Sequence, residues 1–307
     1  MAVFAGTRDS FARARQALRE LCGWQLDDEV IRQLTHAAAR RATATRATRA
    51  DDDRFARAPG VVEVGIDAGK VNTDTGWRDV TVAVVSQREV GDPIGLDGWD
   101  DRDLPARSAR SVVAAIEEVG LFTGRVRAEA DRLGVTTAPD VTVLADGAEW
   151  IGNLGADVFP QATGVRDAFH AREHVSGAVK AVWGAGTPAA AGRMASGRLA
   201  LLGKGKAGIE RWIADQFIDL PAGATGEPLI DLAAYRAPHP THLGYPSRLA
   251  GGRSIGSGRV EGTIKQLINR RLKQTGAKWN VDHVGPLVEL AALVDTPDWN
   301  ALWAMAA

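Results

Sequence analysis

Apolar residues near the start of the chain recur at the spacing of an amphipathic helix. These positions are Phe11, Ala14, Leu18, Leu21 and Cys22. Gly23 ends the run, and Asp27 or Asp28 can cap a second helix. The apolar positions of that second helix are Val30, Ile31, Leu34 and Ala38. Two helices joined by a short turn predict either a DNA-reading helix-turn-helix or an ordinary helical hairpin.

From Pro59 onward the pattern becomes that of β-strands. The preceding residues 40–57 mix arginines with three aspartates and are expected to form an exposed linker. Residues 61–71 predict a buried strand, Thr73–Gly76 a turn and residues 77–90 a second, long strand. The two strands are expected to pair as an antiparallel hairpin with a longish loop. Further elements are expected as strands in the first half of 111–119, at 141–147 and at 163–169, and as a helix at 125–133.

The second half of the chain predicts helices. Residues 187–252 show only helical and loop signals, and residues 255–276 predict a loop followed by a strong helix. A hairpin followed by β/α units implies an α/β fold, a mixed sheet with helices on its faces. The expected segments are a helical N-terminal region and linker (1–58), a core (59–177), a helical insertion (178–252) and a last core segment (253–307).

The composition is that of a globular protein. Of the 307 residues 45% are hydrophobic, which is enough for a sizeable core, and no apolar run is long enough to span a bilayer. The charged N-terminus does not fit a signal peptide, so a cytoplasmic location is expected. A single cysteine, Cys22, excludes an internal disulfide and a cysteine-based zinc finger. The net charge of −1 means that a nucleic-acid surface would have to be a local basic patch.

Three carboxylates lie at the ends of predicted elements, where loops can hold ligands. Asp67 is near the end of the first strand, Asp146 ends the strand VTVLAD, and Glu261 starts the helix after IGSGRV. Such acids usually cap helices or remain solvated. If the sheet placed the two strands side by side and the helix crossed them, the three acids could instead hold Mg²⁺ and assist phosphodiester transfer.

Four blocks of sequence carry a family resemblance. They are TGWRDVTVAVV, VLADGAEWI, DAFHAREHV and IGSGRVEGTIKQLINRRLKQTGAKW, and the resemblance extends over roughly residues 59–303. In these blocks the chain resembles the ISKra-type insertion-sequence transposases. The resemblance implies a DDE transposase with a ribonuclease H-like core: a mixed five-stranded sheet with flanking helices and an all-helical insertion before the last catalytic acid.

The resemblance also implies the site and its partners. Asp67, Asp146 and Glu261 match the three catalytic acids, which would hold two Mg²⁺ ions, with Mn²⁺ able to substitute. The substrate would be double-stranded DNA, at the transposon ends and at the target. The protein would cleave and join DNA strands as a homo-oligomer on the DNA, with no membrane partner.

Two features depart from the family pattern. Family members usually have a much longer N-terminal region for recognising transposon ends. They also tend to have Asn and Arg ahead of the tyrosine before IGSG, where this chain has His239 and His242. We therefore expect a truncated or host-adopted copy. A non-catalytic DNA-binding remnant is a further alternative, which the presence of all three acids disfavours.

The densest group of positive charge in the core surrounds Glu261. Its members are Lys265, Arg270, Arg271, Lys273 and Lys278. A charged helix is usually a solvated face, but phosphate contacts by Lys and Arg supply sequence-independent affinity for DNA. We expect this group to bind DNA, and we expect Asp167 and His170 to support the active site.

His170, Glu173 and His174 allow a second interpretation. They fit the H-x-x-E-H pattern of inverted zincins, in which two histidines one helical turn apart hold zinc and the glutamate activates water. A third zinc ligand is required, and Glu227 and Glu261 are the downstream candidates. A zinc metallopeptidase is therefore the alternative enzyme.

Overall fold

The computed structural model describes residues 1–236 and 239–304. Ala237 and Pro238, in the stretch that departs from the family pattern, lie outside the described residues, as do residues 305–307 of the last core segment. Side chains are described except at Arg236, Pro240 and Arg259.

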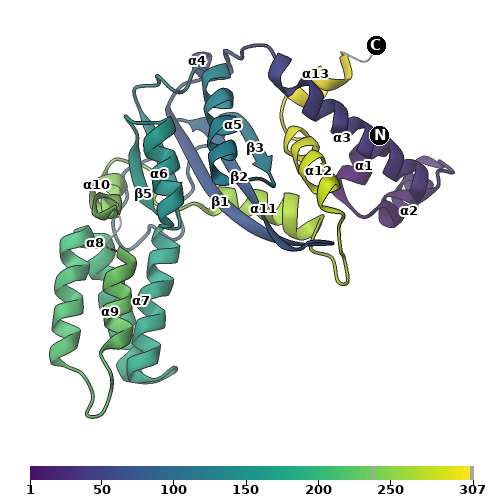
Figure 1. Ribbon diagram of the computed structural model, residues 1–307. Coiled ribbons are helices and arrows are strands. Elements are labelled where there is room, and N and C mark those ends of the chain that lie inside the picture. The colour runs from purple at the N-terminus through teal and green to yellow at the C-terminus, as the bar shows by residue number, and fades with distance from the viewer. Residues whose placement is uncertain (237–238, 305–307) are drawn as a thin grey trace.

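A five-stranded mixed sheet forms the centre of the molecule (Figure 1). Its strands are β1 (Val61–Thr73), β2 (Gly76–Arg88), β3 (Arg107–Ala115), β4 (Val141–Ala145) and β5 (Thr163–Arg166). Their order across the sheet is β3-β2-β1-β4-β5. Strands β1, β2 and β3 pair antiparallel, whereas β4 pairs parallel with β1 and with β5. The α/β class and the mixed five-stranded sheet expected from the sequence are confirmed.

The strands form where apolar side chains fill both faces of the sheet. In β2, Val82 and Val84 belong to one apolar layer, while Ala83 and Val85 belong to the other. Because helices cover both faces, a strand shows a continuous apolar run instead of an apolar–polar alternation. The covering helices are α5 (Val119–Arg132) and α6 (Glu149–Val158) on one face, and α11 (Gly258–Ile264) and α12 (Val281–Leu293) on the other.

The hairpin that joins β1 to β2 is tighter than expected. Thr73 pairs with Gly76, so only Asp74 and Thr75 form the turn. The Thr73 hydroxyl donates to the Gly76 carbonyl at 2.6 Å, and Gly76 adopts a φ of 98°, a conformation that favours glycine. The predicted turn at Thr73–Gly76 is confirmed, whereas the expectation of a longish loop was wrong, because the strand pairing continues to the last residue before the turn.

Helices fill the chain between β5 and α11 and extend away from one end of the sheet (Figure 1). They are α7 (Ala168–Trp183), α8 (Pro188–Ile218), α9 (Glu227–Arg236), η2 (Pro240–Leu243) and α10 (Tyr245–Ala250). No strand occurs among the described residues of 178–252. Residue 178, the expected start of the insertion, lies inside α7. Gly205, with φ 57° and ψ −135°, breaks α8 into two helical segments.

The N-terminal region contains more helix than expected. Its elements are α1 (Ala2–Arg8), α2 (Phe11–Cys22), α3 (Asp28–Thr45), η1 (Arg46–Thr48) and α4 (Arg54–Arg57), and the chain ends in α13 (Asp298–Ala304). Gly23 ends α2 with a φ of 69°, and the Asp27 side chain caps α3, as the sequence predicted. Helix α1 was not expected, because its seven residues are too few to show a helical repeat.

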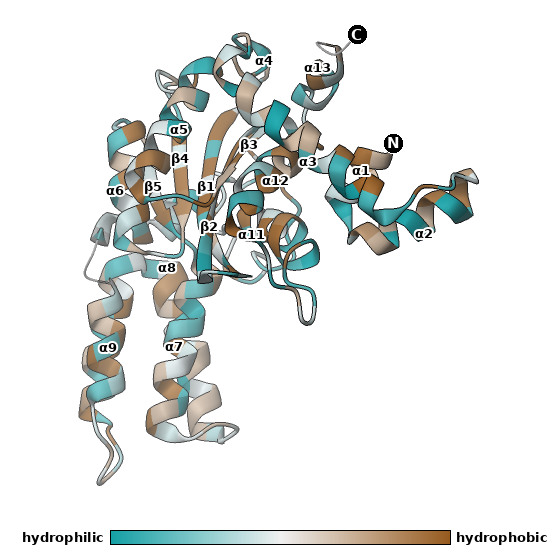
Figure 2. Cartoon of the chain, turned by 45° about the vertical axis from the view of Figure 1, so that its right-hand side comes forward, coloured by the Kyte–Doolittle hydropathy of each residue, from teal (hydrophilic) through white to brown (hydrophobic). Residues whose placement is uncertain are grey.

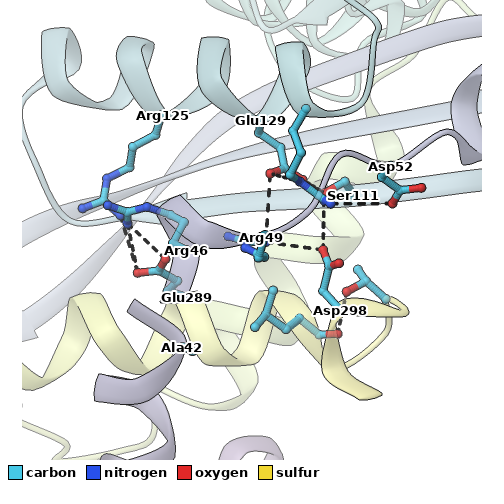
Figure 3. A network of polar contacts seen from close by, with 12 residues as sticks. Ala42, Arg46, Arg49, Asp52, Ser111, Arg125, Glu129, Glu289 and Asp298 are labelled. Carbon is cyan, nitrogen blue, oxygen red and sulfur yellow. Dashed lines mark hydrogen bonds and ion pairs between the residues drawn. The ribbon is translucent and has the colours of Figure 1, made fainter. Parts of the chain in front are cut away.

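The stretch expected to be an exposed linker is instead tied to the core by ion pairs (Figure 3). Arg46 lies 3.0 Å from Glu289 of α12, and Arg49 lies 3.3 Å from Asp298 of α13. The Glu289 side chain is only 8% exposed, so its charge depends on these partners. The linker expectation for residues 40–57 was wrong, because the acids that pair with its arginines lie 243 and 249 residues further along the chain.

Hydrophobic residues concentrate in the sheet, while the helices around it carry mixed surfaces (Figure 2). This distribution matches the buried apolar layers on the two sides of the strands. In the part of the chain that the structure describes, no helix is both long and apolar enough to cross a bilayer.

His36 of α3 is buried against α12. Its ring centroid lies 4.4 Å from that of His283, and the residue is 7% exposed. Burial, followed by the charge of His283, lowers the pKa of His36 to about 4. The neutral imidazole is therefore the form that fits the folded state.

We predict that the free energy of unfolding falls as the pH drops from 7 to 5. The unfolded chain binds a proton at His36 near pH 6.5, whereas the folded chain binds it only near pH 4. The stability is therefore present above pH 6.5 and is lost as the pH falls toward 4. In His36→Phe, the decrease in the free energy of unfolding between pH 7 and pH 5 should be smaller than in the wild type by about 1–2 kcal/mol. Urea denaturation of both proteins at the two pH values measures it. An unchanged pH dependence in the variant would contradict the role of His36.

Candidate active site

Parallel pairing of β1 with β4 places Asp67 and Asp146 at the same level of the sheet. Val62 pairs with Val141, and this offset of 79 residues (141 − 62) continues through four consecutive pairs. The same offset separates Asp146 from Asp67. Asp67 lies within β1, and Asp146 directly follows the last residue of β4. Residues at the same level of adjacent strands share a face, so the two acids belong to one side of the sheet.

Helix α11 crosses this side of β1 and brings Glu261 with it. Gly65 lies two residues before Asp67 and therefore on the same face. A Cβ at Gly65 would lie 3.1 Å from the Cβ of Val260, so the missing side chain lets α11 approach the strand closely. Glu261 directly follows Val260 in the first turn of α11 and is exposed.

The charges of Asp146 and Glu261 both act on Asp67. Burial raises the pKa of Asp67, and the negative charges of Asp146 and Glu261 raise it further. The Ala68 amide, which donates to Asp67 Oδ1 at 2.7 Å, and His170 both lower it. Asp67, Asp146, Glu261 and His170 therefore share one electrostatic neighbourhood, although they come from four separate segments of the chain.

Hydrogen bonds hold the turn that carries Asp146. Its Oδ1 accepts from the Ala148 amide at 2.9 Å, and its main-chain carbonyl accepts from the Tyr235 hydroxyl at 2.6 Å. Gly147 follows with a φ of 105°, and a Cβ there would lie 2.7 Å from Arg166 Nε. Burial raises the pKa of Tyr235 to about 12, so its phenol remains a donor near neutral pH.

Asp167 joins the end of β5 to the loop that precedes α11. It is 1% exposed, and its carboxylate accepts the amide of His170 at 2.8 Å, which caps α7. The same carboxylate accepts the amide of Ser257, the residue before α11. Asp167 therefore fixes the start of the helix that carries Glu261.

The donor set suits a hard divalent cation. Asp67, Asp146 and Glu261 offer carboxylate oxygens, which Mg²⁺ and Mn²⁺ prefer, and a cation would relieve the repulsion that raises the pKa of Asp67. Yet within the described residues no three His, Cys, Asp or Glu side chains stand close enough together to hold one ion. Mg²⁺ usually takes one or two carboxylates together with substrate phosphates, so these acids offer ligands of the kind that it needs.

The two histidines of the alternative zinc interpretation lie beside the three acids and pack against Tyr235 and Glu173. The His170 and His174 ring centroids are 5.0 Å apart, and His170 Nδ1 lies 3.6 Å from Glu173 Oε2. The His174 ring is stacked on Tyr235, with 3.6 Å between the centroids. In the described part of the chain no third ligand is placed to complete a metal site with them. The same absence applies to the three acids, so it does not separate the metallopeptidase interpretation from a site built on Asp67, Asp146 and Glu261.

A continuous helix was expected for the basic stretch after Glu261, but the structure divides this stretch into two helical segments. Helix α11 ends at Ile264, and a π-helix, η3 (Lys265–Arg270), follows. Ile264 and Ile268 both lie over Gly69 of β1, so the wider turn occurs where this segment packs on the strand. Turns of this kind are rare and often lie at functional sites. Four of the five cations expected to bind DNA are exposed: Lys265, Arg270, Lys273 and Lys278.

Arg271, the fifth of these cations, is used within the protein. It is 2% exposed, and its Nε donates to the Gly6 carbonyl at 3.0 Å. Its guanidinium carbon lies 4.7 Å from the Phe11 ring centroid and 4.8 Å from that of Trp279. Burial lowers the pKa of Arg271 to about 10. The expectation that Arg271 binds DNA is corrected accordingly: it anchors the N-terminal helices, a contact between segments 265 residues apart.

Two residues at the site were not expected from the sequence, Arg166 and Tyr235. Arg166 is 1% exposed, and its guanidinium carbon lies 4.5 Å from the Tyr235 ring centroid. Tyr235 reaches Asp146, and Arg166 reaches the neighbouring Gly147, only through the fold. The one available signal was that Tyr235 is one of only two tyrosines in the chain.

No protein-family model and no curated protein matches the sequence. The site combines carboxylates from β1, the end of β4 and α11 with exposed cations that follow Glu261 in the chain. Such an arrangement can hold divalent cations next to a polyanion.

We predict that Arg271→Ala lowers the free energy of unfolding by about 2–3 kcal/mol. The change removes a buried hydrogen bond and two contacts with aromatic rings. Arg270→Ala, at the exposed neighbouring position, should shift stability by no more than about 0.5 kcal/mol. Urea denaturation of the two variants makes the comparison. Equally small effects would argue against the buried role of Arg271.

Proposed function

We propose that the chain is a DDE transposase, which cleaves and joins DNA strands by metal-dependent phosphodiester transfer. The observation that carries this proposal is the arrangement of three acids from β1, the end of β4 and α11 on one side of the sheet. Strands and helices hold ligands more firmly than loops do, which suits a reaction that depends on precise placement.

The sheet supports a ribonuclease H-like core. Its order, β3-β2-β1-β4-β5, combines three antiparallel strands with two that continue parallel to β1. The helical segment between β5 and α11 separates the second acid from the third. This is the arrangement that the resemblance to ISKra-type transposases implies.

The residues of the site have distinct tasks in this proposal. Asp67 and Asp146 would hold Mg²⁺ from the strands, and Glu261 would hold it from α11. The bound ions would activate the attacking oxygen and stabilise the leaving one. Asp167 keeps the start of α11 in place through Ser257. Because Glu261 is exposed while the two aspartates are half-buried, the scissile phosphate would approach from the side of α11.

Exposed cations further along the same segment support DNA as the substrate. The chain has a net charge of −1, so attraction to DNA requires that positive charge be concentrated locally. Such a group follows Glu261 and consists of Lys265, Arg270, Lys273 and Lys278. We propose double-stranded DNA as the partner, bound by a homo-oligomer, because joining two ends calls for two active subunits.

We predict that Asp146→Asn reduces DNA nicking in Mg²⁺ by more than about 100-fold, because the amide keeps the shape of the side chain but loses the charge a cation needs. Binding in a gel-shift assay should be nearly unchanged, because the phosphate contacts lie elsewhere. The matched control is Asp157→Asn, the same change at an exposed acid on α6 that pairs with Arg127. It should affect neither assay.

Two outcomes would count against this assignment. If nicking and DNA binding fell equally in Asp146→Asn, the residue would be structural. If the protein showed a zinc-dependent peptidase activity that survived Asp146→Asn and was lost in His170→Ala, the metallopeptidase would be the better account.

We predict that replacing Lys265, Arg270 and Lys273 with Ala weakens DNA binding for all sequences and flattens its salt dependence. Each lost phosphate contact should reduce the slope of log affinity against log salt by about 0.9. Because all three side chains are exposed, the protein should remain folded. The measurement is a titration of duplex DNA at several salt concentrations.

A matched triple variant on α2 provides the comparison. Arg13, Arg15 and Arg19 are also exposed, and they lie on the N-terminal helical hairpin. If the slope stayed constant in the first variant and fell in the second, the DNA path would run along the N-terminal helices.

A further inference from the structure

The helical insertion reaches the candidate site through Tyr235. This residue, on α9, donates its hydroxyl hydrogen to the main-chain carbonyl of Asp146 at 2.6 Å. The last pair between β4 and β5 is Ala145 with Arg166, so the Asp146 carbonyl lies just beyond the ladder of the sheet. Tyr235 therefore provides a partner for a main-chain group that the strand pairing leaves out.

Both the ring and the backbone of Tyr235 are held in place. Its ring centroid lies 3.6 Å from that of His174, with 15° between the planes, and 4.5 Å from the guanidinium carbon of Arg166. Arg166 also donates to the Tyr235 carbonyl. The Tyr235 ring already stacks on His174, so this face of the ring is not available to a DNA base. Its role is to connect α9 to the end of β4.

Arg166 packs over the turn at Asp146, because a Cβ at Gly147 would lie 2.7 Å from Arg166 Nε, and Arg166 in turn contacts the Tyr235 ring. Gly147, next in the chain, has a φ of 105° and no side chain to limit rotation. The carboxylate itself accepts from the Ala148 amide, which belongs to the same turn and moves with it. Without the Tyr235 bond, rotation of the peptide after Asp146 would move the Ala148 amide, and with it the carboxylate that accepts from this amide, relative to Asp67. Metal ligands must be held within about 0.5 Å, so such a shift matters.

We propose that Tyr235 is a positioning residue for Asp146, through which the packing of the helical insertion sets the place of this carboxylate. The inference rests on the proposed function in one respect, that Asp146 binds a divalent cation. Loss of a residue that hydrogen-bonds to a metal ligand typically lowers the affinity for the metal by about 10- to 100-fold.

The test variant is Tyr235→Phe, which removes the hydroxyl and keeps the stacked ring. The affinity of the full chain for Mn²⁺, measured by calorimetric titration with MnCl₂, should fall about tenfold. Amide hydrogen exchange at residues 145–149 should become faster in the absence of metal and DNA. The Mg²⁺ concentration for half-maximal nicking should rise by a similar factor, while the rate at saturating Mg²⁺ is largely kept.

Trp212→Phe is the matched control within the insertion. It removes a hydrogen-bond donor together with part of a buried ring, because the Trp212 indole donates to Ser196 Oγ at 2.9 Å. Both residues belong to α8, so this bond does not involve the strands. The control should lower thermal stability and leave Mn²⁺ affinity and exchange at residues 145–149 unchanged.

The outcomes separate this inference from the proposed function. Unchanged Mn²⁺ affinity and unchanged exchange in Tyr235→Phe would overturn it, and so would an equal effect of Trp212→Phe, which would indicate general loosening of the insertion. If the wild-type chain bound Mn²⁺ but did not nick DNA, the transposase proposal would fail while these two measurements still decided the role of Tyr235. If the wild-type chain bound no Mn²⁺, both would fall.

Discussion

The parallel register between β1 and β4 is the constraint on which the candidate site depends. Apolar side chains fix this register: Val62 and Val64 of β1 share one buried layer with Val141 and Val143 of β4. A slip by one residue would turn the apolar side chains of β4 to the opposite face, so the core strongly disfavours it. The core packing that stabilises the sheet therefore also places Asp146 beside Asp67. Gly65 allows α11 to pack closely on β1, which brings Glu261 to the same side of the sheet.

The segments around the sheet are fastened to it by buried or half-buried arginines. Arg46 and Arg49 bind acids of α12 and α13, Arg271 holds α1 through Gly6, and Arg166 contacts Tyr235 of the insertion. Leaving a buried or half-buried charge without its partner is unfavourable, so each such contact favours one placement of its segment. These arginines fix how the outer helices sit on the sheet, whereas DNA affinity requires cations that remain exposed.

Local patterns predicted most of the fold. The apolar runs of β1, β2 and β4, the stop at Gly23 and the cap at Asp27 depend on neighbours in sequence, and the structure contains them where they were expected. What failed depends on distant contacts. Arg271 has the appearance of a DNA-binding cation until Gly6 and Phe11 are placed beside it, and the contact of Tyr235 with Asp146 spans 89 residues. Pairings of this kind leave no periodicity in the sequence.

We expect divalent cations to bind between the strand acids and the α11 acid. The most direct measurement is the anomalous scattering of Mn²⁺ in crystals of the protein bound to duplex DNA. We expect anomalous peaks within coordination distance of Asp67 and Asp146, with Glu261 turned toward them. Peaks confined to His170 and His174, or ordered DNA with no manganese at the three acids, would contradict the account.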